Sequence, residues 1–133
     1  HKKNDSRGLA LVLGCGGAPL SGLVAGALGW DVILTDLGEV VSLTQRNVDR
    51  NITALSLARE CVGMKNTSVD IQVMELPFGD HTSLKSAIGS RITKQNSGGD
   101  ETQFVVLCSD CVWQKALHSP LLSTVVAALQ TSS

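Results

Sequence analysis

The sequence contains no tyrosine, and its two Phe and two Trp residues make up only 3% of the chain. A hydrophobic core must therefore be built from aliphatic side chains. Neither charge dominates, because 11 Lys and Arg are balanced by 12 Asp and Glu to give a net charge of -1. This balance argues against a broad nucleic-acid-binding surface, which would need an excess of basic residues.

Long hydrophobic runs are also missing. No apolar stretch approaches the roughly 18 residues of a membrane span, and the polar segment from His1 to Arg7 lacks the apolar core of a secretory signal. We therefore expect no association with a membrane. At 133 residues and 43% hydrophobic content, the chain is long enough for one globular domain over 1–133. Within it, 1–8 is a polar N-terminal segment and 93–103 is expected to be a flexible loop.

The cysteines are few and scattered, at Cys15, Cys61, Cys108 and Cys111. This scatter does not resemble a secreted disulfide framework and predicts a reducing compartment, the cytoplasm. The last two form one C-x-x-C motif, but neither a second pair nor histidines at ligand spacing accompany it. We therefore predict no metal site and expect buried, inert thiols in preference to a redox or metal-binding role.

The segment from Leu9 to Asp36 is the most informative part of the chain. It reads as a strand LALVL, a glycine loop GCGGAPLSG, an apolar helix and a second strand DVILTD. Glycines let a backbone approach a ligand closely, and an acid ending the second strand commonly meets ribose hydroxyls. In a dinucleotide fingerprint Gly14 and Gly16 fit, but the third glycine position is Pro19. A glycine turn that binds nothing is the alternative interpretation.

The rest of the chain alternates between helical and strand patterns. Apolar residues at helical spacing predict helices over 39–59, 81–92 and from Gln114 onward, with Pro120 in the first turn of the last helix. An alternating strand is expected at 69–74, and the apolar run 104–108 predicts a strand buried on both faces. Such alternation predicts an α/β fold with a parallel sheet.

Ligands bind such sheets at the carboxyl ends of the strands. The loops expected there are 14–22, 76–80 and 109–113, with Asp36 joining them from the second strand. These loops bring an aromatic ring from Phe78 and a carboxylate from Asp110. Their convergence predicts a ligand site.

Three ordered segments, LGCGG to RNVDRN, ELPFGD and CSDCVWQKALHSPLL, together resemble the class I S-adenosylmethionine-dependent methyltransferases. More narrowly, they resemble the methyltransferase-16 family of protein-lysine methyltransferases, over roughly Leu9 to Leu129. The resemblance implies a Rossmann-like three-layer sandwich with a mostly parallel sheet of the seven-strand type, apparently truncated because only four strands are found. It also implies S-adenosyl-L-methionine as cofactor and a protein with a target lysine as partner.

The resemblance further implies cofactor-binding residues. Gly14, Gly16 and the adjacent Gly17 match the glycine loop that lies against the methionyl part of the cofactor. Asp36 matches the acid that faces the ribose, and Phe78 stands where the family commonly has a tryptophan against adenine. Ser109, which opens the motif at the fourth strand, is the remaining cofactor-binding candidate.

Asp110 and Trp113 match the family's Asp-x-x-Tyr motif beside the methyl-accepting amine, and they are the candidate catalytic residues. Methyl transfer from a sulfonium to a neutral amine mainly requires that the two groups be held in line. Asp110 would attract and orient the amine, and the Trp113 ring would hold the cation on its face. Structural roles are the alternatives: a plug at the core edge for Phe78, a helix cap for Asp110 and a core anchor for Trp113.

Two other functions compete with methyl transfer. Val12 stands where the family usually has an acid before the loop, and Ala18-Pro19 replaces the usual Thr-Gly. These departures favour a degenerate, non-catalytic domain that serves as a binding or assembly subunit. Cofactor binding separates that function from an enzyme. A nicotinamide-dependent oxidoreductase shares the strand, loop and acid, but it is disfavoured by Pro19 and does not explain the Ser-Asp-Cys-Val-Trp motif.

Overall fold

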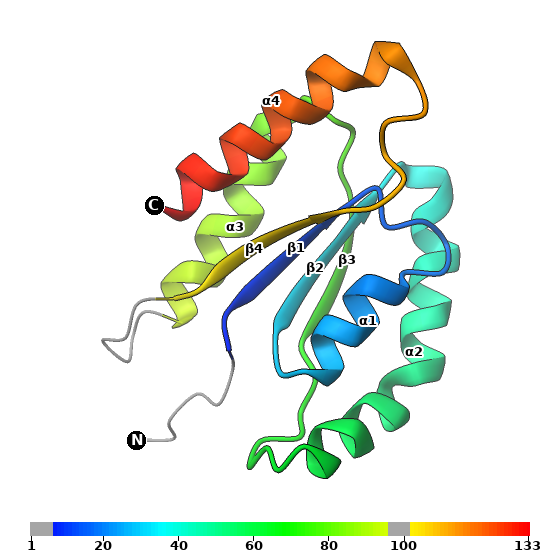
Figure 1. Ribbon diagram of the computed structural model, residues 1–133, viewed down its shortest axis with the longest axis vertical. Coiled ribbons are helices and arrows are strands. Elements are labelled where there is room, and N and C mark those ends of the chain that lie inside the picture. The colour runs from blue at the N-terminus through cyan, green and yellow to red at the C-terminus, as the bar shows by residue number, and fades with distance from the viewer. Residues whose placement is uncertain (1–6, 96–101) are drawn as a thin grey trace.

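A computed structural model describes residues 7–95 and 102–133 (Figure 1). Strands and helices alternate along these residues, as the sequence predicts. Their bounds are β1 Leu9–Leu13, α1 Leu20–Ala27, β2 Asp31–Asp36, α2 Gly38–Cys61, β3 Ile71–Glu75, α3 His81–Gln95, β4 Phe104–Cys108 and α4 Lys115–Ser132. Most of the expected flexible loop, 96–101, lies outside the described residues. No helix within the described ranges is long and apolar enough to cross a membrane.

The strands form one parallel sheet in the order β3-β2-β1-β4. The predicted α/β class with a parallel sheet is therefore confirmed, in a Rossmann-like arrangement. A seven-stranded sheet is not formed by the described residues, because they supply only four segments with a strand pattern. The chain builds outward from β1 through β2 to β3 and then returns to the other side of β1 as β4. This reversal creates a switch point between β1 and β4.

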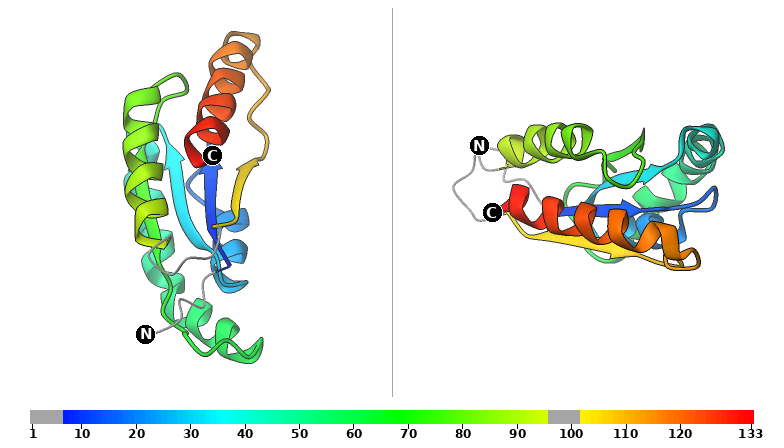
Figure 2. Two further views of the ribbon diagram at one scale, coloured as in Figure 1. Left: turned by 90° about the vertical axis from the view of Figure 1, so that its left-hand side faces the viewer. Right: turned by 90° about the horizontal axis from the view of Figure 1, so that it is seen from above.

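Helices cover both faces of the sheet, so the molecule has three layers (Figures 1 and 2). Alternate residues of β1 explain this arrangement, because successive strand side chains point to opposite faces. Ala10 and Val12 pack on the side of α1 and α2, whereas Leu9, Leu11 and Leu13 pack on the side of α3 and α4. All five are buried, as expected for the central strand of a parallel sheet. Both cores are almost entirely aliphatic.

Strand β4 corrects one expectation. Its apolar run predicted burial on both faces, yet Phe104 to Leu107 are only half-buried and Cys108 is exposed. The reason is position: β4 is an edge strand that pairs with β1 alone among the described residues.

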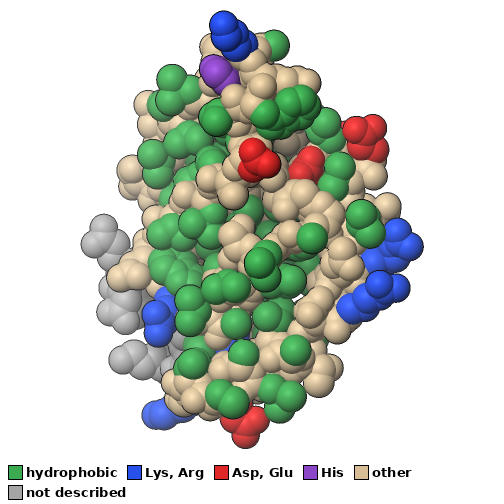
Figure 3. Space-filling model, turned by 45° about the vertical axis from the view of Figure 1, so that its right-hand side comes forward, with side chains coloured by type: hydrophobic (Ala, Val, Ile, Leu, Met, Phe, Trp, Pro, Cys, Tyr) green, Lys and Arg blue, Asp and Glu red, His purple; other side chains and the backbone are tan. Residues whose placement is uncertain are grey.

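In the view of Figure 3, hydrophobic side chains gather over the middle of the face, with Lys and Arg toward its margins.

Three helices also differ from the prediction. Helix α3 ends at Gln95 and not at 92, so residues 93–95 belong to the helix and not to the expected loop. Helix α2 continues unbroken from Gly38 to Cys61, beyond both ends of the predicted 39–59. Pro120 lies inside α4 and not in its first turn, because that helix begins at Lys115. A proline here removes one backbone donor from the helix interior. The carbonyl of Pro120 still accepts a hydrogen bond from the Thr124 hydroxyl at 2.7 Å.

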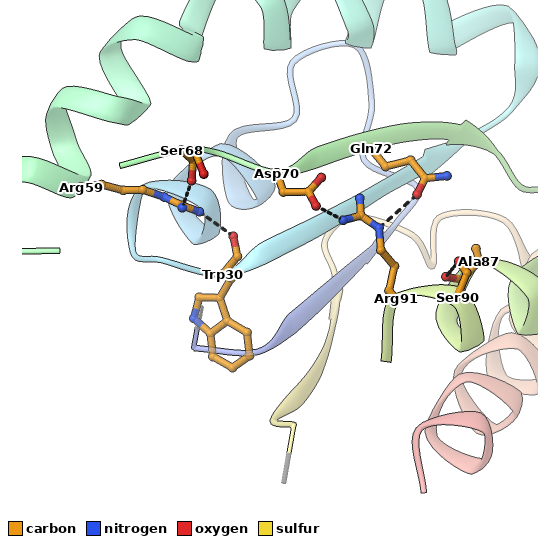
Figure 4. Close-up of polar contacts among 8 residues, drawn as sticks. All are labelled: Trp30, Arg59, Ser68, Asp70, Gln72, Ala87, Ser90 and Arg91. Atoms are coloured by element: carbon orange, nitrogen blue, oxygen red, sulfur yellow. Dashed lines mark hydrogen bonds and ion pairs between the residues drawn. The ribbon is translucent and has the colours of Figure 1, made fainter. Parts of the chain in front are cut away.

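Two buried arginines tie helices to the strand ends opposite the switch point (Figure 4). Arg59 of α2 is 2% exposed and donates to three backbone carbonyls, those of Gly26 at 2.7 Å, Trp30 at 3.0 Å and Ser68. These carbonyls belong to α1 and to the segments that lead into β2 and β3. One guanidinium therefore fixes three parts of the chain relative to one another.

Arg91 makes a comparable tie from the other face of the sheet. It forms an ion pair with Asp70 and a 3.3 Å hydrogen bond with Gln72 (Figure 4). Asp70 immediately precedes β3, and Gln72 lies within that strand. Edge strand β3 is thus held by α3 as well as by its pairing with β2.

Candidate functional site

A cleft of about 280 Å³ opens beside the switch point, where β1 and β4 end. Open α/β sheets bind ligands at this kind of position. The volume lies just below the roughly 300–1,000 Å³ typical of small-molecule pockets, so a larger ligand would extend beyond it. Its lining residues are Gly14, Asp36, Leu37, Leu76, Pro77, Phe78, Asp110, Cys111, Trp113 and Leu117.

The structure therefore brings five of the eight predicted site residues together. Gly14 follows β1, Asp36 ends β2, and Phe78 follows β3. Asp110 and Trp113 come from the loop between β4 and α4. The expectation that these loops converge at one edge of the sheet is confirmed, because all the strands are parallel and end on the same side.

Gly14 has a backbone requirement that only glycine meets easily. Its φ is +61°, in the left-handed region that L side chains rarely adopt. A Cβ there would lie 3.0 Å from the Cys111 sulfur and 3.5 Å from Cζ of Phe78. A side chain at Gly14 would therefore take up space where two cleft residues meet.

Asp36 connects β2 with the glycine loop. One carboxylate oxygen accepts a hydrogen bond from the Gly16 N–H at 2.7 Å, and the other accepts one from the Leu37 N–H at 2.7 Å. Each carboxylate oxygen can accept a second bond. Asp36 can therefore keep both backbone bonds and still accept hydroxyl donors from the cleft side.

Asp110 occupies an unusual backbone position. Its φ is +57°, the only positive φ of a non-glycine residue in the described part of the chain, and aspartate tolerates this region better than most residues. The next residue, Cys111, is buried, and its thiol donates to the Leu13 and Ser109 carbonyls at 3.2 and 3.3 Å. The sharp turn thus tucks Cys111 inward and leaves Asp110 on the cleft. Asp110 does not cap α4, since Gln114 precedes that helix.

The two aromatic rings of the cleft differ in burial. Phe78 is half-buried and packs against the core cluster beside α3 and α4, so it has a structural role while one part of it faces the cleft. Trp113 is 71% exposed and is not a core anchor. The His118 ring, on α4, forms a 2.8 Å hydrogen bond with the Val112 carbonyl, next to Trp113 in the sequence. This bond connects the cleft loop to α4.

The remaining three predicted residues do not line the cleft. Gly16 is held by Asp36. Gly17 lies against α2, where a Cβ would come 2.5 Å from Leu43 Cδ2. Ser109 is exposed, and its carbonyl accepts the Cys111 thiol proton. Gly16 and Gly17 therefore shape the loop from outside the cleft lining.

The glycine fingerprint is also completed differently from the prediction. Pro19 stands at the expected third position, but Gly22 of α1 provides the close approach of helix to sheet. A Cβ on Gly22 would lie 2.2 Å from Leu34 Cδ2 and 3.3 Å from Val12 Cγ2. Close packing of helix on strand is the function of the third glycine in a nucleotide-binding loop. A glycine pattern that allows for extra loop residues before the third glycine would identify Gly22 from the sequence.

The electrostatics of the cleft favour cations. Two carboxylates, Asp36 and Asp110, line it together with the Phe78 and Trp113 rings, and its lining contains no Lys or Arg. Carboxylates and aromatic faces both attract positive charge. A pyrophosphate would meet two negative groups and no counter-charge from these lining residues. Leu37 and Leu117 also line the cleft but were not predicted, since an apolar residue that precedes a helix or lies in its first turn is as typical of a core position as of a site.

The cysteines are only partly as expected, since Cys111 is buried but Cys61 and Cys108 are exposed. Burial raises the pKa of the Cys15 thiol to about 11, and the nearby Asp36 carboxylate adds to this rise. Burial also raises the pKa of Cys111. Cys108 is exposed at the surface but partly desolvated, and this desolvation, together with the neighbouring Cys111 thiol, raises its pKa as well. These three thiols are therefore protonated at neutral pH.

The raised pKa of Cys15 predicts how it reacts. Iodoacetamide should modify it slowly at pH 8, with the rate rising about tenfold per pH unit toward pH 11, because the thiolate is the nucleophile. Asp36→Asn should accelerate the reaction at pH 8 by removing a charge that disfavours the thiolate. Peptide mass spectrometry gives the rate at each pH, with exposed Cys61 as the internal control. A rate that does not change between pH 8 and pH 10 would contradict the raised pKa.

No protein-family model matches this chain, and a search of curated proteins finds no match for it.

Proposed function

We propose that this chain is a class I methyltransferase domain that binds S-adenosyl-L-methionine and transfers its methyl group to a lysine of a protein. The observation that carries the proposal is the cleft at the switch point, lined by two carboxylates and two aromatic rings without a Lys or Arg. This lining suits a cationic sulfonium and a cationic amine better than it suits an anionic dinucleotide. The nicotinamide-dependent alternative is therefore disfavoured.

The lining residues fit the cofactor's parts. Asp36 would accept the ribose hydroxyls with the oxygen lone pairs that its two backbone bonds leave available. Exposed Leu37 and half-buried Phe78 offer apolar surface for a purine base. Gly14, which has no side chain, leaves room between Phe78 and Cys111. When bound, S-adenosyl-L-methionine would supply an electrophilic methyl group on a positively charged sulfur.

Asp110 and Trp113 would hold the substrate amine. Both lie on the loop after β4, and the left-handed turn at Asp110 keeps its carboxylate on the cleft. A lysine ammonium would be attracted to this carboxylate and to the exposed Trp113 ring. It would reach the cleft from solvent and release a proton to water before reacting. Positioning of the amine, not strong base catalysis, is the contribution of these residues.

The lysine-bearing protein substrate and the cytoplasmic location are part of the same proposal. The substrate class rests on the resemblance of the three sequence segments, and the location rests on the scattered cysteines. A methyltransferase-like domain that binds partners without catalysis is the outcome we would accept if the cofactor does not bind.

Isothermal titration with S-adenosyl-L-methionine and its demethylated product tests the proposal. We expect saturable binding that weakens about tenfold to a hundredfold in Asp36→Ala, because a hydrogen bond to a charged group contributes about 1.5–3 kcal/mol. Asp49→Ala is the matched control. Asp49 is an exposed aspartate of α2 that pairs with Gln45 and does not line the cleft.

The same titration separates the competing functions. Asp110→Asn should reduce affinity for the cationic cofactor more than affinity for its neutral product, since only the former carries the sulfonium charge. Binding of a nicotinamide dinucleotide in preference to both compounds would support the oxidoreductase. The absence of binding to a folded chain would reject the enzyme and favour a non-catalytic domain.

A further inference from the structure

Helix α2 supplies three side chains that lie against the glycine loop although none of them lines the cleft. The Thr44 hydroxyl donates to the Gly16 carbonyl at 2.9 Å, and the Asn47 side-chain amide donates to the Gly17 carbonyl at 2.6 Å. Leu43 fills the space that a Cβ on Gly17 would occupy. We call Leu43, Thr44 and Asn47 the α2 clamp. Leu43 and Thr44 lie four and three positions before Asn47, so both are neighbours of Asn47 on the helix surface.

The clamp and Asp36 hold the loop from two sides. Asp36 accepts a hydrogen bond from the Gly16 N–H. The Thr44 and Asn47 side chains donate to the Gly16 and Gly17 carbonyls. Because a peptide unit is planar and trans, each N–H points opposite to the carbonyl of the same unit. Turning the Gly16 and Gly17 carbonyls toward α2 therefore turns the N–H groups of Gly17 and Ala18 away from it. The orientation of the loop is thus set by side chains 28 and 30 residues further along.

A loop of this composition needs such a constraint. Gly14 and Gly16 have positive φ angles, and glycine loses more backbone entropy on ordering than any other residue. The Asn47 side chain donates its hydrogen bond to the loop and not to a carbonyl of its own helix. The Thr44 hydroxyl, by contrast, also lies 3.2 Å from the Val40 carbonyl of its own helix. Asn47 is therefore the clamp residue whose polar contact serves the loop alone.

We propose that Asn47 is a positioning residue that orders the glycine loop for ligand binding in the cleft. It acts through Gly17 and does not touch the ligand. The identity of the ligand, S-adenosyl-L-methionine, rests on the proposed function, whereas the ordering of the loop does not. Asn47 should accordingly affect the ligand-free loop and cofactor affinity together.

Asn47→Asp tests this role with little change in shape. The aspartate cannot donate to the Gly17 carbonyl and places a negative charge beside it. Asn51→Asp is the matched control, because Asn51 lies one turn further along α2 and its side chain donates to the Asn47 carbonyl of its own helix, at 2.7 Å, and not to the glycine loop among the described residues. The first readout is hydrogen exchange of the Gly16 amide by NMR without ligand. The second is the dissociation constant for S-adenosyl-L-methionine, with circular dichroism to verify folding.

We expect Asn47→Asp to accelerate exchange of the Gly16 amide about tenfold and to weaken cofactor binding by a similar factor, corresponding to one lost hydrogen bond. Asn51→Asp should change neither by more than about twofold. Asn47→Ala should give the same direction as Asn47→Asp, which separates loss of the donor from added charge.

Each readout has its own failure. Unchanged Gly16 exchange in a folded Asn47→Asp variant would overturn the positioning role, whatever the ligand. Equal changes in the Asn47 and Asn51 variants would also overturn it, because the effect would then belong to α2 as a whole. If the parent chain binds neither S-adenosyl-L-methionine nor its product, the proposed function fails, while Gly16 exchange still decides whether Asn47 orders the loop.

Discussion

Replacing Arg59 with methionine should lower the free energy of unfolding by about 3–5 kcal/mol. The arginine is 2% exposed and donates to the carbonyls of Gly26, Trp30 and Ser68. Methionine fills much of the same volume but leaves the Trp30 and Ser68 carbonyls without the guanidinium donor, whereas the Gly26 carbonyl keeps its 3.1 Å bond from the Gly29 N–H. Each buried unsatisfied group costs about 1–3 kcal/mol. Domains of this size have only about 5–15 kcal/mol of stability in total. The loss is therefore a large part of the whole.

Urea unfolding followed by far-UV circular dichroism measures the change. Arg50→Met is the matched control, because Arg50 is an exposed arginine of the same helix, and it should shift stability by less than about 0.5 kcal/mol. Arg59→Lys keeps the charge but not the planar fork of donors, so it should fall between the parent and Arg59→Met. Equal stability of Arg59→Met and Arg50→Met would show that the Trp30 and Ser68 carbonyls find other donors.

Gly22→Val should destabilise the chain by about 3 kcal/mol. The added Cβ alone would lie 2.2 Å from Leu34 Cδ2 and 3.3 Å from Val12 Cγ2. Both of these side chains are buried in the sheet core. Valine adds two further methyl groups to the same space. Extra methyl groups in a filled core cost typically 1–3 kcal/mol, and α1 cannot move outward without shifting the glycine loop that precedes it.

Gly89→Val provides the control for this substitution. Gly89 also lies within a helix, α3, but a Cβ there meets no atom within 4 Å. Because valine is a slightly better helix former than glycine, stability should stay within about 0.5 kcal/mol of the parent. The difference between the two variants, measured by thermal unfolding, isolates the packing of α1 on the sheet. Similar stability of both variants would contradict the close approach at Gly22.

The order and type of the elements were predictable from the sequence, because they depend on local patterns. An apolar five-residue run fits β1 at the centre of a parallel sheet, and helical spacing of apolar residues marked α2 and α3. The convergence of Gly14, Asp36, Phe78, Asp110 and Trp113 also followed from the sequence. Parallel strands must end on the same side, so residues that follow strands gather at one edge without any knowledge of distances.

Position within the sheet was not predictable in the same way. Phe104 to Cys108 has the composition of a fully buried strand, yet β4 lies at an edge. An apolar run states only that a strand can be buried, whereas strand order decides whether neighbours are present to bury it. The start of the last helix was predicted to within one residue, at Gln114 against the observed Lys115, but Pro120 lies inside α4 and not in its first turn.

The α/β class follows from the sequence alone, as do the parallel direction of the strands and the edge of the sheet at which the predicted site residues gather. Periodicity, glycine and acid positions are local properties, and they are sufficient for these conclusions. Three features become visible only in the packed molecule: Gly22 lies against the sheet, Arg59 connects three segments, and Asn47 holds the glycine loop. Each of these depends on contacts between residues 9 to 33 positions apart. Such contacts are set by how helices and strands pack, which no local pattern of residues specifies.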